Sequence, residues 1–352
     1  MTLMRVAMVA PPWFEVPPTS YGGIETMIAD LVDQLTSRGH EVTLIGAGRD
    51  LTSATTFVPV FEEPPSSRLG EALPEVVHAA AVSRLLSSLD VDVVHDHSLA
   101  GPLLARGRRT PTVVTMHGPV DAEHGEIMAA LGETVHVVAI SDAQRRDRTD
   151  INWVATVYNA IDVEQYPFAQ EKDEAVLWMG RFTPDKGPEL AIDAAREAGV
   201  PIVLAGKCSE PAEQEFFDAE IEPRLGEGVR YVGEAGGRAK RELCASARAL
   251  VFPIQWEEPF GIVMLEALAC GTPVVATRRG SVPEVVEEGV NGVLVDADAE
   301  VDEIARAIHA AVGIDPARCR ASVRLRFTPQ LMADGYEAVY GSVIDPAAPS
   351  AL

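Results

Sequence analysis

The stretch Glu258-Pro-Phe-Gly-Ile-Val-Met-Leu-Glu266, which continues as Ala-Leu-Ala-Cys-Gly-Thr-Pro-Val-Val275, decides how this chain is interpreted. Residues 262–269 form an apolar run of good helix formers. Gly271 stands where a glycine commonly ends a helix, and Pro273 prevents the helix from resuming. The sequence therefore predicts a short, buried helix that begins near Phe260 or Gly261.

Two carboxylates stand at defined places relative to this helix. Glu258 lies in the loop just before its N-terminus, and Glu266 lies about two turns inside it. The first N–H groups of a helix have no partner within it, so they attract phosphate or a hydroxyl-rich ligand. A carboxylate in so apolar a helix needs a partner, because burying it unpaired costs several kcal/mol. A ribose and a hexose would each supply hydroxyl donors, so the pattern indicates a nucleotide-sugar site.

The composite of Glu-x7-Glu, Phe260-Gly261 and Ala267-x-Ala-x-Gly-x-Pro resembles the signature of the family-4 retaining glycosyltransferases, which have the GT-B fold. The resemblance implies two Rossmann-like domains with parallel sheets that face a central cleft. It also implies that Glu258 binds hexose hydroxyls, that Glu266 binds the ribose, and that the helix N-terminus from Phe260 through Gly261 and Ile262 to Val263 lies at the donor.

A second motif, Gly180-Arg-Phe-Thr-Pro-Asp-Lys-Gly187, follows a predicted strand and precedes a predicted helix. Arg181 and Lys186 are five residues apart on a turn, so a planar fork and a point charge can converge on one diphosphate. The motif matches the Gly-Arg-x4-Lys-Gly turn of the family, in which both cations bind the diphosphate of the donor. The contact to the base is expected from the loop around Val232, largely through its backbone.

The loop between the first predicted strand and the first predicted helix, residues 11–25, is rich in proline and aromatic residues. Gly22 and Gly23 allow backbone amides to approach an anion at a helix N-terminus. In the family a Gly-Gly pair here closes over the donor phosphates, and the preceding loop helps to form the acceptor site. We therefore expect acceptor contacts from Trp13, Tyr21 and Glu25.

Two further strand ends carry polar side chains. His117 ends the predicted strand 112–116, where a single histidine is more often structural, but a family histidine of this kind lies near the reacting sugar. We therefore expect His117 to act in catalysis, together with Glu258, Arg181 and Lys186. Asp96 and His97 follow the strand 91–95; the pattern leaves a role at the acceptor and a structural role equally open for them.

Composition limits the class of protein. The chain of 352 residues is long enough for two domains, and its four cysteines show no metal-binding spacing. A net charge of −24 argues against nucleic acid and against an anionic bilayer as partners. No apolar run approaches the length of a membrane span, and the N-terminal run is too short for a signal peptide. We expect a cytoplasmic protein for which association with membranes is unlikely.

Strand-like and helix-like segments alternate along the chain, as in an α/β protein with parallel sheets. Three segments follow: an acceptor domain over residues 1–168, a nucleotide-sugar donor domain over residues 169–325, and a C-terminal helix and tail over residues 326–352. In the family such a helix crosses back to the first domain. The two Rossmann-like series place the quoted motifs at strand ends, where ligands bind in such folds.

The pairs Asp90-Val-Asp92 and Asp296-Ala-Asp298 have a spacing that metal-dependent transferases use. The first precedes its strand and the second follows a β-like segment in a polar turn, so we interpret both as chance and predict neither a metal nor a cofactor.

Several functions stay open at this point. A retaining hexosyltransferase that uses a nucleoside-diphosphate sugar explains the most motifs, with UDP favoured by its frequency in the family. A GT-B nucleotide-sugar epimerase and a non-catalytic nucleotide-sugar binding protein are the alternatives, and an oxidoreductase lacks its glycine fingerprint. The base, the hexose and the acceptor are not legible in the sequence.

Overall fold

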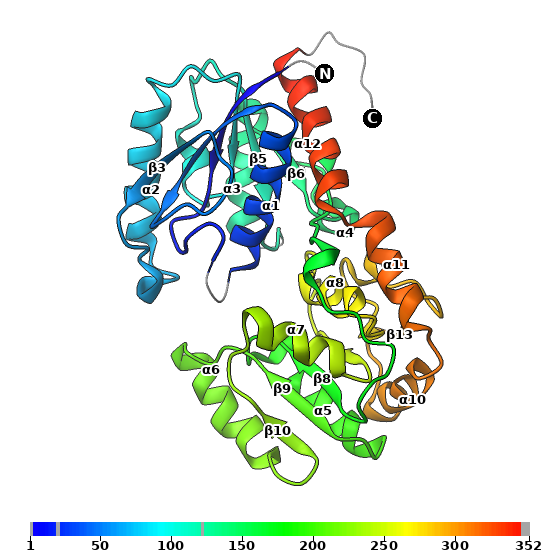
Figure 1. Ribbon diagram of the computed structural model, residues 1–352. Helices are drawn as coiled ribbons and strands as arrows, with labels where there is room; N and C mark the ends of the chain where they lie inside the picture. Colours follow the sequence, from blue (N-terminus) through cyan, green and yellow to red (C-terminus); the bar gives the residue numbers. More distant parts are fainter. Residues whose placement is uncertain (1–2, 19–21, 121–122, 346–352) are drawn as a thin grey trace. The chain divides into compact units, whose positions relative to one another are not determined.

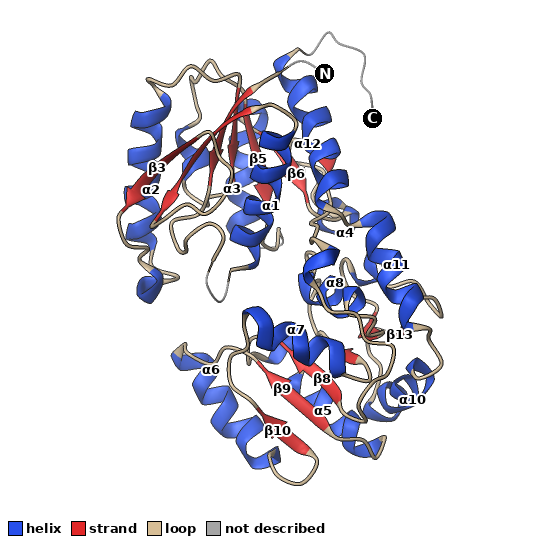
Figure 2. Ribbon diagram, viewed as in Figure 1, coloured by secondary structure: helices blue, strands red, loops and turns tan. Residues whose placement is uncertain are grey.

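The computed structural model describes residues 3–18, 22–120 and 123–345 and divides into two compact units (Figure 1). The first unit comprises Met1–Ala160 together with Pro329–Leu352, and the second comprises Ile161–Thr328. Each unit holds one parallel β-sheet flanked by helices (Figure 2). The expected pair of Rossmann-like α/β sheets, as in the GT-B fold, is confirmed.

The first sheet has seven strands in the order β3-β2-β1-β4-β5-β6-β7. Its strands are β1 (Arg5–Val9), β2 (Glu41–Ala47), β3 (Thr56–Phe61), β4 (Val93–Asp96), β5 (Thr112–Met116), β6 (His136–Ala139) and β7 (Trp153–Thr156). The helices of this unit are α1 (Gly23–Ser37), α2 (Ala72–Leu86), α3 (Glu123–Leu131), α4 (Asp142–Arg145) and α12 (Pro329–Ile344). All strand pairs in this sheet are parallel.

Alternation along the central strand β1 explains how the helices are distributed. Val6 and Met8 pack in one core with α1 and α12, whereas Ala7 and Val9 pack in another with α2. Successive side chains of a strand point to opposite faces, so a strand covered on both sides reads as a continuous apolar run. This burial on both faces is why the sequence identifies β1 readily.

The strands β3 and β7 were not predicted, and they form the two edges of this sheet. Pro59 interrupts the pattern of β3, and an edge strand tolerates proline because one side of its backbone needs no partner in the sheet. Both strands are only partly buried, so their apolar signal is weaker than that of the central strands.

The helix α12 is part of the first unit, although it is the last element of the chain. It packs beside α1 in the shared core, as the adjacent ribbons in Figure 1 show. Arg38 at the end of α1 pairs with Asp334 (2.7 Å) and with Glu337 of α12. His40 Nε2 lies 2.7 Å from Glu337 Oε1, and His40 Nδ1 accepts a hydrogen bond from the backbone N–H of Met4. These two contacts tie α12 to the sheet.

The second sheet has six parallel strands in the order β10-β9-β8-β11-β12-β13. Its strands are β8 (Val176–Met179), β9 (Ile202–Ala205), β10 (Val229–Tyr231), β11 (Leu250–Phe252), β12 (Val274–Thr277) and β13 (Gly292–Val295). The helices are α5 (Pro188–Glu197), α6 (Pro211–Phe216), α7 (Gly237–Ser246), α8 (Ile262–Ala269), α9 (Val282–Val285), α10 (Val301–Ala311) and α11 (Pro316–Arg326). The bounds of α8 agree with the apolar run 262–269, and in the first unit β5 agrees with the predicted strand 112–116.

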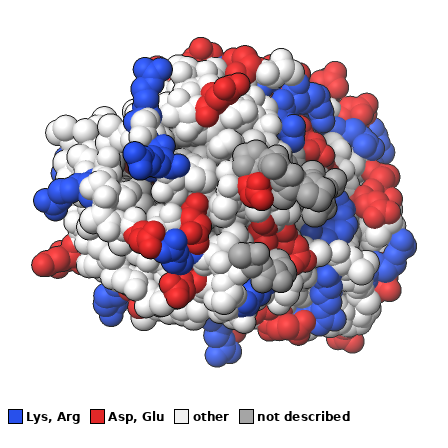
Figure 3. Space-filling model, turned by 90° about the horizontal axis from the view of Figure 1, so that it is seen from above, with Lys and Arg blue, Asp and Glu red and all other residues white. Residues whose placement is uncertain are grey.

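Two observations bear on possible partners. Among the described residues, no helix combines the length and the apolar character needed to cross a membrane. On the face shown in Figure 3, acidic and basic side chains are intermixed, so the large net charge produces no continuous acidic surface there.

Candidate functional site

Strand order identifies one place in each sheet where a ligand is expected. In the first sheet, β2 lies on one side of β1 and β4 lies on the other. In the second sheet, β9 lies on one side of β8 and β11 lies on the other. Loops that leave the carboxyl ends of such neighbouring strands diverge and create a binding crevice. The loops after β1, β4, β8 and β11 are the ones that carry most of the motifs quoted above.

The turn after β8 brings Arg181 and Lys186 to the carboxyl edge of the second sheet. A short 3₁₀ turn covers Pro184–Lys186, and Gly187 then starts α5 in the left-handed region with φ of 60°. A Cβ at Gly187 would collide with the carbonyl oxygen of Pro253, which follows β11. The backbone of Gln255 also donates to the carbonyl of Asp185 (2.8 Å), so the two loops at this switch point support one another.

Lys186 and Glu258 form a partly buried ion pair between these two loops. Lys186 Nζ lies 2.5 Å from Glu258 Oε2 and 4.4 Å from the centre of the Trp256 ring. The Trp256 indole donates a hydrogen bond to the same oxygen, Oε2, at 2.9 Å. Glu258 Oε1 has no hydrogen-bond partner among the described residues, so one carboxylate oxygen is fixed and the other is left to accept.

Arg181 has a weaker carboxylate partner. Its guanidinium is partly exposed and lies 3.8 Å from Oε1 of Glu213 at the start of α6. Glu213 is almost fully buried, and its other oxygen accepts from the backbone of Ser209 (3.0 Å) and Glu210 (3.2 Å). The guanidinium is therefore oriented without being neutralised by a close contact.

A glycine caps the N-terminus of α8. Gly261 caps it in the left-handed region with φ of 74°, and a Cβ there would lie 2.8 Å from the methyl carbon of Met264. Gly280, after β12, presses against the backbone of Glu258, and Ser281 donates to the carbonyls of Glu258 and Phe260 (both 2.9 Å). The loop that carries Glu258 is thus fixed from two sides.

The other residues near the N-terminus of α8 differ in solvent exposure. Phe260 is buried, whereas Ile262 and Val263 are half-buried. Val232, one residue beyond β10, is exposed at the edge of the same sheet. A contact of these residues with a nucleotide stays a prediction.

Glu266 is buried on α8 with two partners. Tyr166 donates to Oε1 (3.3 Å), and Lys240 of α7 lies 2.6 Å from Oε2. Burial and the adjacent Glu266 carboxylate raise the pKa of the Tyr166 phenol well above its ordinary value, so the phenol keeps its proton. The need for a partner, inferred from the sequence, is met within the second unit.

In the first unit, Gly22 and Gly23 start α1 as expected. Gly22 has φ of 145°, and a Cβ there would lie 2.9 Å from a carboxylate oxygen of Glu25. Glu25 is 3% exposed, and burial raises its pKa to about 7. Trp13 is half-buried, with its indole donating to Glu75 of α2 (2.8 Å). Tyr21 lies outside the described residues.

Asp96, a candidate acceptor contact, is fully buried. Its Oδ1 accepts from the backbone (2.9 Å) and the hydroxyl (2.7 Å) of Ser98, and a Cβ on Gly101 would collide with Oδ2. Burial raises the pKa of this carboxyl to about 6. The side chain stabilises the turn after β4, and a contact with an acceptor stays a prediction.

His117 belongs to a group of three histidines at the ends of β4 and β5. His97 Nδ1 lies 2.9 Å from His117 Nε2, and the ring centroids of His95 and His97 are 4.0 Å apart. His95 is hydrogen-bonded to Tyr340 of α12 and to Thr115 of β5, each at 2.7 Å. Burial lowers the pKa of His117 to about 3, so the ring is neutral at physiological pH.

Sequence reasoning did not identify Trp256, Glu213 or the loop at Gly280-Ser281 as parts of this arrangement. The last of these had a signal, because a Gly-Ser pair stands shortly after the buried strand β12, separated from it by two residues. Trp256 and Glu213 had none, since the cations that they contact, Lys186 and Arg181, lie 70 and 32 residues earlier in the chain.

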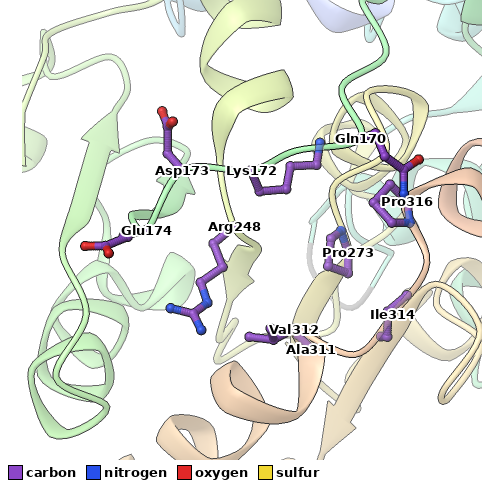
Figure 4. Close-up of a pocket in the computed structure, with 10 residues that line it drawn as sticks. All are labelled: Gln170, Lys172, Asp173, Glu174, Arg248, Pro273, Ala311, Val312, Ile314 and Pro316. Carbon is purple, nitrogen blue, oxygen red and sulfur yellow. The ribbon is translucent and has the colours of Figure 1, made fainter.

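A cavity of about 530 Å³ lies at the opposite edge of the second sheet (Figure 4). Glu174, Arg248 and Pro273, which line it, each precede a strand. Lys172 also lines it, but its ammonium donates to the carbonyls of Ala245 (2.9 Å) and Cys270 (3.0 Å) and to Thr272 Oγ1 (2.9 Å). This cavity is separate from the carboxyl edge that carries Arg181 and Lys186.

Comparison with known proteins agrees with the geometry. The family described as Glycosyl transferases group 1 matches residues 162–322, and Glycosyltransferase Family 4 matches residues 21–165. An alpha-maltose-1-phosphate synthase of Mycolicibacterium smegmatis is 32% identical over 90% of this chain and 92% of its own.

Two solved structures share the fold. AviGT4, a glycosyltransferase involved in avilamycin A biosynthesis, is 28% identical with a TM-score of 0.75, covering 98% of this chain and 99% of its own. HepE of Anabaena, solved in complex with UDP-glucose, is 20% identical with a TM-score of 0.75, covering 96% of this chain and all of its own. The chain belongs to the group 1 glycosyltransferases of family 4.

Proposed function

We propose that this glycosyltransferase moves a hexose from a nucleoside-diphosphate sugar to a hydroxyl of a small-molecule or glycan acceptor, with retention at the anomeric carbon. The observation that carries the proposal is the Lys186–Glu258 ion pair with its open Glu258 Oε1, beside the N-terminus of α8. A cation, free helix N–H groups and a carboxylate oxygen are the groups that a sugar diphosphate needs.

In this proposal Arg181 and Lys186 bind the leaving diphosphate as negative charge develops on it. Removing one such donor from a site costs on the order of 3 kcal/mol in the activation barrier. Glu258 accepts hydrogen bonds from hexose hydroxyls, and Glu266 accepts from the ribose. In the first unit, Gly22, Gly23 and His117 are the proposed contributors to donor binding.

Retention is proposed without a covalent intermediate. The hexose would be transferred on the face from which the diphosphate departs, with the leaving phosphate accepting the proton of the acceptor hydroxyl. Glu258 is proposed to bind the hexose, with its open Oε1 accepting from a hydroxyl while Lys186 and Trp256 hold Oε2.

UDP is the proposed nucleotide. HepE, which shares the fold, was solved with UDP-glucose, and Val232 is exposed where a base contact is expected. Transfer is proposed to be independent of divalent metal, since Arg181 and Lys186 supply positive charge. Asp92, one of the Asp-x-Asp candidates, instead binds Arg5 (2.7 Å), which also pairs with Asp90.

Thermal denaturation with added nucleotides tests the donor site. UDP, GDP, ADP and NAD would each be added with EDTA or with magnesium. A ligand at 100 times its Kd adds about 2.7 kcal/mol to the free energy of unfolding, which is enough for a visible rise in Tm. We expect a shift with UDP that survives EDTA; a shift with NAD alone, or with none of the four, would contradict the proposal.

Product analysis tests retention. NMR of the product formed from UDP-glucose and an accepted sugar would report the anomeric configuration. An α-linked product from the α-configured donor supports retention, and a β-linked product rejects it.

A further inference from the structure

The histidine at position 97 is buried between two side chains that differ in what they can donate. His97 Nε2 lies 3.2 Å from Met8 Sδ on β1, and His97 Nδ1 lies 2.9 Å from His117 Nε2. The rings of His97 and His117 are stacked, with centroids 5.2 Å apart. His117 Nδ1 makes no hydrogen bond to another described residue.

The positions of the protons follow from this chain of contacts. A thioether sulfur has no proton and accepts only, so the proton between His97 and Met8 belongs to His97 Nε2. Burial holds the pKa of His97 well below its ordinary value, so the ring is neutral and its Nδ1 is bare. Nδ1 must then accept from His117 Nε2, which leaves Nδ1 of the neutral His117 ring bare as well.

We propose that His97, itself oriented by Met8, is a positioning residue that fixes His117 as the Nε2–H tautomer and so makes His117 Nδ1 a hydrogen-bond acceptor. A bare ring nitrogen accepts a hydrogen bond from a sugar hydroxyl. It repels a phosphate oxygen, because the nitrogen and the phosphate oxygen each present a lone pair and neither has a proton to donate. On the proposed function, His117 therefore contacts a hydroxyl of the hexose or of the acceptor and does not contact the diphosphate.

Among the described residues around His97, none competes with Met8 and His117 for its ring nitrogens. His95 packs against the ring, but its own nitrogens are used by Tyr340 and Thr115. The carboxylate of Asp96 accepts from Ser98. The tautomer of His117 thus depends on two atoms, Met8 Sδ and His97 Nδ1.

NMR of the full-length protein labelled with ¹⁵N in histidine measures this tautomer without any substrate. Protonated and bare ring nitrogens have well-separated ¹⁵N shifts, and the signals of His117 are assigned by their loss in His117→Gln. We expect His117 to be protonated at Nε2 only. A His117 protonated at Nδ1 in the wild-type protein overturns the proposal.

Three variants test the cause. His97→Phe keeps a ring but removes the acceptor, so the second tautomer of His117 becomes populated, whereas His97→Asn supplies an amide oxygen near the place of Nδ1 and restores Nε2–H. Met8→Leu keeps the volume and removes the sulfur, and it also gives a mixture; Met27→Leu, in the same core, is the matched control and gives none.

The outcomes separate the two residues. If the tautomer of His117 is unchanged in His97→Phe, the role assigned to His97 is overturned. If His97→Phe does not fold, an unchanged tautomer of His117 in Met8→Leu overturns it instead. If His97→Phe changes the tautomer and Met8→Leu does not, the role assigned to Met8 is rejected.

Kinetics then distinguish this inference from the proposed function. With UDP-glucose as donor, we expect His97→Phe to lower kcat/KM by about tenfold, the value of one hydrogen bond, and His97→Asn to recover most of it. The affinity for UDP, which has no hexose, should not change. Failure of the wild-type protein to bind any nucleotide would reject the proposed function while the NMR result stands.

Discussion

The charged pairs of the second unit differ in electrostatic form from the histidine pair of the first unit. In the second unit, Lys186 is paired with Glu258 and Arg181 faces Glu213, so the carboxyl edge of that sheet holds formal charges of both signs. In the first unit, the corresponding edge holds neutral rings, with His97 and His117 linked to one another and kept uncharged by burial.

This difference matches the two parts of the proposed substrate. A diphosphate is bound by fixed cations whose attraction strengthens as charge develops on the leaving group. Hydroxyl groups carry no charge, so neutral acceptors and donors of defined tautomer discriminate among them at lower desolvation cost. We therefore expect variants of the charged residues in the second unit to affect nucleotide binding, and variants of the buried polar side chains in the first unit to affect the sugar or the stability of the fold.

The largest effect is expected for Lys186→Ala. The variant removes the cation nearest to Glu258 and leaves that carboxylate buried without a countercharge, so kcat/KM should fall by a factor on the order of 10² to 10³. UDP should no longer raise Tm. Arg306→Ala, on an exposed pair of α10, is the control; a UDP shift that survives in Lys186→Ala would show that the diphosphate binds elsewhere.

Glu25→Gln tests the first unit through the pH dependence of stability. Burial raises the pKa of Glu25 from 4.5 to about 7, so the folded state holds a proton that the unfolded chain releases, and ionisation destabilises the fold as pH rises from about 4.5 through about 7. Removing the carboxyl should stabilise the protein by up to roughly 3 kcal/mol above pH 7 and have little effect near pH 4.5.

Urea denaturation at pH 5, 6.5 and 8 measures this gain. The exposed Glu63, replaced by Gln, serves as the control and should give no gain that grows with pH. A gain in Glu25→Gln that is the same at all three values would mean that the carboxyl ionises freely in the folded protein.

Glu258→Gln should distinguish recognition of the sugar from binding of the nucleotide. Loss of a hydrogen bond from a hydroxyl to a charged group costs about 1.5 to 3 kcal/mol, so kcat/KM for the sugar donor should fall by roughly 10- to 100-fold. UDP affinity, measured by calorimetry, should stay or rise, because Lys186 loses its neutralising partner. A parallel loss of UDP affinity would instead place Glu258 at the diphosphate.

The parts of the fold predicted from the sequence are those with local signals. The helix α8 was located to within two residues because Gly261 precedes it, and Gly271 and Pro273 follow it. The turn at Arg181 and Lys186 was located because glycines bound it. The edge strand β3 was missed, because a strand covered on one side and containing Pro59 lacks the continuous apolar run.

The contacts around the candidate residues could not be predicted in the same way. Met8 and His97 are 89 residues apart, and Trp256 contacts Lys186 across two loops. Such pairs depend on strand order, which a single sequence leaves open. Once the order β1-β4-β5 is known, Met8, His97 and His117 fall on three neighbouring strand ends, and their contact follows.

The smallest expected effect is that of Tyr340→Phe, which removes the hydroxyl bonded to His95 Nδ1. A buried polar group left without its partner costs about 1 to 3 kcal/mol, and this loss should appear as a lower free energy of unfolding in urea. UDP binding should not change, since the charged groups that we propose for the diphosphate belong to the second unit. Thr115→Val breaks the bonds to both His95 and Tyr336 and should cost more than Tyr340→Phe, again with UDP binding intact. A loss of UDP affinity in either variant would mean that the neutral network helps to hold the charged groups, and the electrostatic division between the units would not hold.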